Sequence, residues 1–246
     1  MITQMEKEMI YVNGLEYPVN IHYEWRNSTR VSITKSGINI RVPRTLGIFK
    51  RQKVIGEMKN WAVKKLIKIP DLVRRDEPKK YVSGDTIEVF GVVYVIEISL
   101  KDAKKSSGKI NDNIVYLRVS MHLAGEDLHK DVSNLLSRVL AKKHYNEIAS
   151  RVHAHNNMYF NKRINKISLK NHKSKWGSCS SYGNINLSTR LFFAPTKVLD
   201  YVIIHELAHL VEHNHSRNFW NHVERAMPDY KEKKKWLNDH GHKCKF

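Results

Sequence analysis

The feature that most constrains the fold is an apolar segment at residues 198–212 that contains two histidines. Its apolar side chains follow a helical period, and Pro195 with Thr196 as the N-cap is typical of a helix start. Residues 205–209 are His-Glu-Leu-Ala-His, so both imidazoles lie on one helical face. Because imidazoles one turn apart can bind the same ion, the segment predicts a buried helix with two ligands of a zinc site.

Glu206 lies directly beside the first histidine of this pair. A carboxylate at this position can hold a zinc-bound water and act as its general base. Short motifs of this kind also occur by chance. An amphipathic helix with two incidental histidines is therefore the alternative interpretation.

A catalytic zinc ion usually takes a third protein ligand and leaves a fourth position for water. A straight helix would carry His215 about 9 Å along the axis past His209, so the chain has to turn back. Asn214 tolerates the left-handed conformation that ends helices, which favours a turn there and makes His215 the better ligand. His213 and Glu224 are the alternative third ligands.

Three segments of the chain together carry a family resemblance. They are the run 173–195, with Lys-Trp-Gly-Ser-Cys-Ser at 175–180, the helical residues 200–209, and Asn-His-Ser-Arg-Asn-Phe-Trp at 214–220. This combination resembles the YgjP-like metallopeptidases, which are similar to the SprT/Spartan-type zinc proteases. The resemblance extends, more weakly, over most of the chain.

The resemblance implies a zinc-dependent metallopeptidase with one Zn²⁺ ion and a protein or peptide substrate. It implies the zinc ligands His205, His209 and His215, with Glu206 as the catalytic acid/base. In that mechanism Glu206 takes a proton from the zinc-bound water, hydroxide attacks the scissile carbonyl, and the proton passes to the leaving amine. The resemblance implies little about which protein is cleaved.

The strand expected at residues 184–191 precedes the zinc helix and is a candidate edge of the cleft. An edge strand can hold an extended peptide by backbone pairing. The substrate-binding candidates are Asn184, Ile185, Asn186 and Arg190. The alternative is that the neighbouring Trp-Gly-Ser-Cys segment is only a packing turn, and the two interpretations are compatible.

Several further side chains are candidates for roles at the site. Tyr182, Tyr201 and Arg190 can stabilise an oxyanion, although no spacing singles one of them out. Cys179 is either a zinc ligand, a thiolate that blocks the zinc, or simply a small residue buried beside a turn, and the last is favoured.

The net charge constrains the partners. The chain has 43 Lys and Arg against 24 Asp and Glu, a net charge of +19, which argues against a strongly basic partner and favours an acidic one such as nucleic acid. The excess lies in residues 1–80 and 161–246, whereas 81–160 is nearly neutral. No helix-turn-helix, RNP or zinc-finger spacing is present, so binding would be sequence-independent and salt-sensitive.

Two functions are therefore weighed. The first is the metallopeptidase, with substrates that include nucleic-acid-associated proteins by analogy with the Spartan-type enzymes. The second is a basic nucleic-acid-binding module, including DNA-binding, whose zinc site is structural or vestigial. The simplest interpretation of the net positive charge is a solvated basic surface that only keeps the protein soluble.

The expected compartment is the cytoplasm. The chain has 2 cysteines that form no Cys-x-x-Cys pair, so neither a disulfide framework nor a cysteine zinc finger is expected. No apolar run approaches the length that spans a bilayer, so no membrane partner is expected. The first residues contain acidic groups and no apolar signal core.

The expected fold class is α+β. Strand-like alternation dominates residues 1–120, interrupted by one helix near 48–69, and a zincin-like part with the HExxH helix follows at 125–246. A link is expected at 70–80. Because the loop expected at 101–113 is short for a linker, two domains and one compact unit both fit. No internal repeat is evident in the sequence.

Overall fold

The computed structural model describes residues 4–34, 36–68, 79–172 and 174–246. Contacts divide the chain into two compact units, Met1–Glu77 and Pro78–Phe246. The link expected at 70–80 lies almost entirely outside the described residues. The division falls upstream of the expected boundary at 120–125, so the strands between residues 86 and 120 belong with the metal-site unit and not with an N-terminal part.

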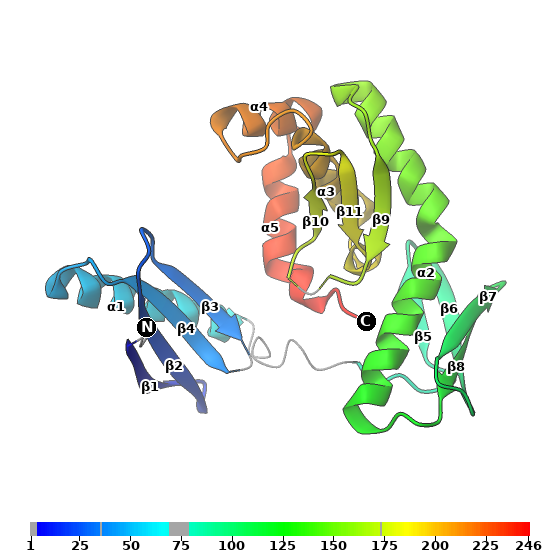
Figure 1. The fold of residues 1–246 in the computed structure, drawn as a ribbon, viewed down its shortest axis with the longest axis horizontal. Coiled ribbons are helices and arrows are strands. Elements are labelled where there is room, and N and C mark those ends of the chain that lie inside the picture. Colours follow the sequence, from blue (N-terminus) through cyan, green and yellow to red (C-terminus); the bar gives the residue numbers. More distant parts are fainter. Residues whose placement is uncertain (1–3, 35, 69–78, 173) are drawn as a thin grey trace. The chain divides into compact units, whose positions relative to one another are not determined.

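The first unit is a four-stranded sheet covered on one face by a helix (Figure 1). Its strand order is β1-β2-β4-β3, with β2 and β4 parallel in the centre and an antiparallel strand on each side. Alternate residues of the strands are buried and form a separate core with α1. The elements are β1 (Gln4–Val12), β2 (Leu15–Glu24), β3 (Arg30–Thr34), β4 (Gly37–Pro43) and α1 (Ile48–Lys68).

The second unit begins with a sheet of the same design. Its order is β5-β6-β8-β7, again with a parallel central pair and antiparallel edges, and a helix follows in the chain. Phe90 and Gly91 form the turn of the hairpin between β5 and β6, and both residues have positive φ (50° and 79°), which suits a tight turn. The elements are β5 (Thr86–Val89), β6 (Val92–Lys101), β7 (Ser107–Asn111), β8 (Ile114–Ser120) and α2 (Gly125–His155).

The prediction of a loop at 101–113 is wrong in part, because these residues contain β7. This strand is polar and exposed along most of its length, so it shows no apolar alternation. The structure also shows a repeat that the sequence does not, since four strands in the same order and sense precede a helix in each unit.

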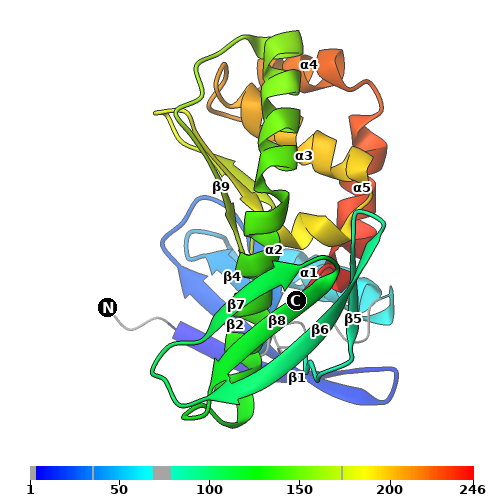
Figure 2. The same cartoon turned by 90° about the vertical axis from the view of Figure 1, so that its right-hand side faces the viewer.

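The metal-site layer of the second unit is a smaller sheet with three helices. The sheet has the order β10-β11-β9, and α2 contacts both β9 and the larger sheet, so one long helix joins the two layers (Figure 2). The elements are a π-helical turn (Asn156–Phe160), β9 (Lys166–Lys170), β10 (Gly177–Cys179), β11 (Asn184–Ser188), a 3₁₀ turn (Thr189–Phe193), α3 (Thr196–Ala208), α4 (Arg217–Ala226), α5 (Tyr230–His240) and a 3₁₀ turn (Gly241–Lys243).

The expected zinc helix is present but shorter than 198–212. It begins at Thr196 with Pro195 as the N-cap, so Thr196 is not the cap, and it ends at Ala208. The α+β class is confirmed. Within the described residues, no helix has the length and apolar character needed to cross a bilayer.

Candidate metal centre

The helix α3 is buried because its side chains are apolar on nearly all sides. Ile203, Ile204 and Leu207 are almost fully enclosed in the core of the second unit. This packing fixes the rotation of the helix, so that His205 and Glu206 project from a rigid element. His209 is the C-cap residue, at the point where the chain leaves the helix.

The chain returns to the helix through a polar turn. The Asn214 side-chain oxygen accepts a hydrogen bond from the Ser216 backbone N–H at 2.9 Å, and Ser216 in turn caps α4 by accepting from the Phe219 N–H at 3.3 Å. The turn at Asn214 is therefore made by its side chain. The left-handed conformation expected there is wrong, since Asn214 is not among the positive-φ residues.

This turn brings His215 back to the helix. The Nε2 atoms of His215 and His205 lie 3.1 Å apart. The ligating atoms of His205, His209 and His215 all lie within 4.8 Å of one another, and this is the one such group that the described ranges contain. Nitrogens about 2.0–2.1 Å from one tetrahedral zinc ion lie roughly 3.4 Å apart, so the cluster is close to the size that one ion needs.

The donor set suits a zinc ion. His209 Nδ1 faces the Glu212 carbonyl oxygen at 3.2 Å, so an Nδ1–H donated there leaves Nε2 free as a ligand. Burial lowers the pKa of His205 to about 3, and it also lowers the pKa of His209. Neutral imidazoles are the form that binds a metal. His215 is exposed to solvent, so one side of the three-ligand set is open.

One phenylalanine contacts all three imidazoles. The Phe219 ring centroid lies 4.9 Å from that of His205, 4.5 Å from His209 and 4.7 Å from His215. Phe219 is completely buried, and Trp220 lies beside the rings of His205 and His215. The rings of Phe219 and Trp220 orient the imidazoles by van der Waals packing and not by polar contacts.

The Glu206 carboxyl is buried beside β10. Burial raises its pKa to about 8, although the charge of Lys175 and a hydrogen bond from the Cys179 backbone N–H oppose the rise. Gly177 leaves room for the carboxyl, because a Cβ there would lie 2.5 Å from Glu206 Oε1. A divalent cation near this carboxyl would favour its ionised form.

The other ligand candidates lie outside the histidine cluster. Glu224 is on α4, where its carboxylate lies 3.6 Å from Lys231 Nζ. His213 is exposed and lines a neighbouring pocket. Burial raises the pKa of the Cys179 thiol to about 11, which keeps it protonated, and its Sγ donates to the Ser180 carbonyl.

The candidate oxyanion stabilisers occupy three different environments. Tyr201 is buried edge-on against the ring of His205, with centroids 6.0 Å apart. Tyr182 is exposed. Arg190 holds the C-terminal segment, since it donates to the carbonyls of Gly241 and Cys244 and stacks on Trp176 at 4.2 Å.

The expected edge strand is not at the edge. β11 pairs with β10 on one side and with β9 on the other, so its backbone is already used. Ile185 is fully buried, whereas Asn184 bonds to Asn165 and Asn186 bonds to Ser178. Among the described strands of this sheet, β10 has the free side next to Glu206.

A pocket of about 450 Å³ adjoins the end of the metal-binding segment. Its walls come from three stretches of chain: the one after the π-helical turn, the β10–β11 turn, and the one between His209 and His215. The lining has three basic side chains and no carboxylate. The lining residues are Lys162, Arg163, Asn165, Ser181, Tyr182, Gly183, Leu210 and His213.

The comparison with protein families agrees with this geometry. The family described as YgjP-like, metallopeptidase domain, matches residues 27–240. The chain belongs to the YgjP-like metallopeptidases. The match includes both sheets of the second unit and, from the first unit, β3, β4 and α1, whereas β1 and β2 lie outside it.

Two solved structures resemble part of this YgjP-like chain. The metallopeptidase zymogen abylysin of Pyrococcus abyssi is 26% identical, with a TM-score of 0.35, and the match covers 37% of this chain and 92% of abylysin. The metallopeptidase zymogen jannalysin of Methanocaldococcus jannaschii is 24% identical, with a TM-score of 0.33, and the match covers 37% and 93%. No curated protein matches.

Proposed function

We propose that this YgjP-like protein is a zinc-dependent peptidase whose ligands are His205, His209 and His215 and whose acid/base is Glu206. The observation that carries the proposal is the convergence of three imidazoles beside one buried carboxyl. A zinc ion held there would supply Lewis acidity, which polarises a scissile carbonyl and lowers the pKa of a water ligand.

Glu206 has the surroundings of a group that moves a proton. It follows the first ligand in the chain, and the Cys179 N–H fixes the direction of its carboxyl. From this position it accepts a proton from the attacking water and delivers it to the leaving amine. The enclosing core excludes bulk water from one side of the carboxyl.

Two neighbouring features suit a peptide substrate. The free side of β10 offers backbone N–H and C=O groups next to Glu206, and an extended peptide can add to it as a further strand. The pocket beyond the β10–β11 turn has the basic residues Lys162, Arg163 and His213. An acidic side chain of the substrate is the group that this lining suits.

The test is substitution of Glu206 by Gln. The amide keeps the shape of the side chain but cannot take a proton, so we expect stoichiometric zinc and a loss of peptide hydrolysis of at least about 10³-fold. Zinc is measured on the purified protein by elemental analysis. Cleavage is measured on denatured protein substrates and on a mixed peptide library.

A matched control is Glu224→Gln, which removes a carboxylate that lies on an exposed part of α4. It should leave both zinc content and hydrolysis unchanged. Hydrolysis by the Glu206→Gln protein at the wild-type rate would exclude Glu206 as the acid/base. Loss of zinc from it would place the carboxyl in the ligand set.

A structural zinc site is the second candidate. Structural sites are closed by four protein ligands, whereas the cluster here has three, one of which is exposed. The open side therefore favours catalysis.

A further inference from the structure

One face of the sheet in the first unit has no covering element among the described residues of that unit. Helix α1 packs against the opposite face, where it contacts β1, β3 and β4 (Figure 1). The buried residues of β2 and β4 alternate with residues that point away from the helix. The residues that point away from α1 form a surface that we call the open sheet face.

The strand register arranges the open sheet face in rows. Residues directly opposite one another lie on the same face of a sheet, and in the first row Arg41 lies between His22 and Arg30. The complete rows, from β1 to β3, are Met5, His22, Arg41 and Arg30, then Lys7, Asn20, Asn39 and Ser32.

Acidic and basic side chains of β1 are separated between the two faces. Glu6 accepts a hydrogen bond from the hydroxyl of Tyr23, a residue of the core under α1, and Glu8 forms an ion pair with Lys59 of α1. Lys7 alternates with them and therefore points to the open sheet face. The acidic residues of β1 therefore do not neutralise the positive charge of the open sheet face.

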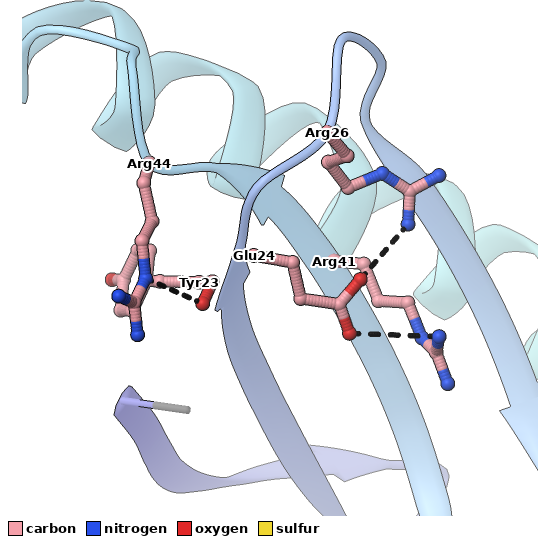
Figure 3. A network of polar contacts seen from close by, with 5 residues as sticks. All are labelled: Tyr23, Glu24, Arg26, Arg41 and Arg44. Atoms are coloured by element: carbon pink, nitrogen blue, oxygen red, sulfur yellow. Dashed lines mark hydrogen bonds and ion pairs between the residues drawn. The ribbon is translucent and has the colours of Figure 1, made fainter. Parts of the chain in front are cut away.

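Two arginines oppose each other directly on this face. Arg30 and Arg41 are cross-strand partners, and like charges in that position destabilise a sheet. One carboxylate, Glu24, lies 3.5 Å from Arg41 and 3.4 Å from Arg26 (Figure 3). Two guanidinium groups therefore share a single carboxylate, and Arg30 adds a third cation opposite Arg41, which is an arrangement that attracts an anion.

Exposed aromatic rings accompany this charge. Trp25 follows Glu24 at the end of β2 and is 73% exposed, and Tyr11, at the other end of the open sheet face, is 70% exposed. Exposed planar rings beside cations are the components with which proteins hold single strands, because bases stack on the rings while cations contact the phosphates.

We propose that the open sheet face binds single-stranded nucleic acid. Arg26, Arg30 and Arg41 contact the phosphates, and Trp25 stacks on a base. The proposal does not depend on the peptidase, since every residue involved lies outside the second unit.

The chemistry of the face favours a nucleic acid over a lipid surface. Insertion into a bilayer needs a contiguous apolar surface, but Lys7 separates Met5 from Met9 along β1.

The experiment measures binding of the full chain to a fluorescein-labelled 12-nucleotide oligo(dT) by anisotropy, over a range of salt concentrations. The double variant Arg30→Gln/Arg41→Gln should weaken binding about tenfold, and the slope of log affinity against log salt should fall by about 1.4, or about 0.7 for each lost contact. Trp25→Ala should weaken binding at least about fivefold, and Trp25→Phe should restore most of the affinity.

Matched controls come from the helix side of the same unit. Lys50→Gln/Lys53→Gln removes two exposed charges from α1, and Phe49→Ala removes an exposed ring there. Both should change affinity less than twofold. Circular dichroism checks that each variant is folded.

Three outcomes would overturn the proposal. Equal weakening by the lysine and the arginine double variants would reduce the effect to overall charge. Binding of a duplex of the same length as tightly as the single strand would exclude base stacking. Binding to vesicles that contain phosphatidylserine, without binding to the oligonucleotide, would assign the face to a membrane.

Discussion

Gly177 matters because it has no side chain. A Cβ at this position would meet Glu206 Oε1 at 2.5 Å, and the carboxyl is enclosed on its other sides by the core. The substitution Gly177→Ala should therefore displace the carboxyl and lower hydrolysis by at least about 100-fold, with zinc content retained. Steady-state cleavage and zinc analysis check this, with Gly56→Ala on α1 as the control, because a Cβ there meets nothing within 4 Å. Full activity in the alanine variant would mean that β10 can move aside.

The buried Glu206 carboxyl should make the metal-free protein less stable as the pH rises. Its pKa is raised from 4.5 to about 8 in the folded chain. Below pH 4.5 both states are protonated, and between 4.5 and about 8 only the unfolded state ionises, so stability is lost across this window.

Glu206→Gln should remove that dependence. At pH 8, in the presence of a chelator, we expect its free energy of unfolding to exceed that of the wild type by a few kcal/mol, since one pKa unit corresponds to about 1.4 kcal/mol. At pH 4 the two should be nearly equal. Urea unfolding at both pH values measures the difference, and Glu224→Gln, on the exposed part of α4, should follow the wild type. If the free energies of unfolding of the wild type and of Glu206→Gln changed with pH in parallel, the buried position of the Glu206 carboxyl would be contradicted.

At the residue scale, spacing alone was enough to predict part of the centre. His205 and His209 are four residues apart, so the helical period predicts their shared face, and Glu206 directly follows His205 in the chain. His215 required an argument about how the chain turns, and the physical means of that turn was wrongly predicted. Phe219 was missed as a contact of all three ligands, because packing partners have no spacing rule.

At the scale of elements, the ligand set depends on the start of α4. Ser216 caps this helix, which begins directly after His215 and carries Phe219. Ser216→Ala should cost about 1 kcal/mol of stability through the lost cap and weaken zinc binding about fivefold, because His215 is then less well held. Competition with a chromophoric chelator measures the zinc affinity. Ser181→Ala is the control, and an unchanged affinity in Ser216→Ala would mean that the ligands hold the turn without the cap.

Elements were predicted well where one face of the strand or helix is apolar. The strands at β2, β4 and β8 and the helix α1 have this pattern, so their alternation or period was visible. β1 shows no such pattern, because its exposed face carries methionines while its helix side carries glutamates. β10 is only 3 residues long, which is too short for any period to appear.

At the scale of the whole molecule, the same arrangement of four strands and a helix occurs twice. The strand order and the sense of each pair agree between the two sheets. No similarity of residues makes this visible in the sequence, because strand pairing constrains the positions of buried side chains and not their identities. In the second unit the helix is longer, with 31 residues, and continues onto the metal-site layer.

The two units also have separate cores, which makes their independence testable. One core is built from residues between Val12 and Leu66, and the other from residues between Tyr81 and Phe246. Since all three ligands and Glu206 lie in the second unit, a chain of residues 78–246 should fold cooperatively and bind one zinc ion with the affinity of the full chain. Calorimetric unfolding and zinc titration measure this. The full chain is the control, and the fragment should lose binding to oligo(dT) if the open sheet face is the nucleic-acid site. A fragment that stays unfolded with zinc present would show that the first unit is needed to complete the second.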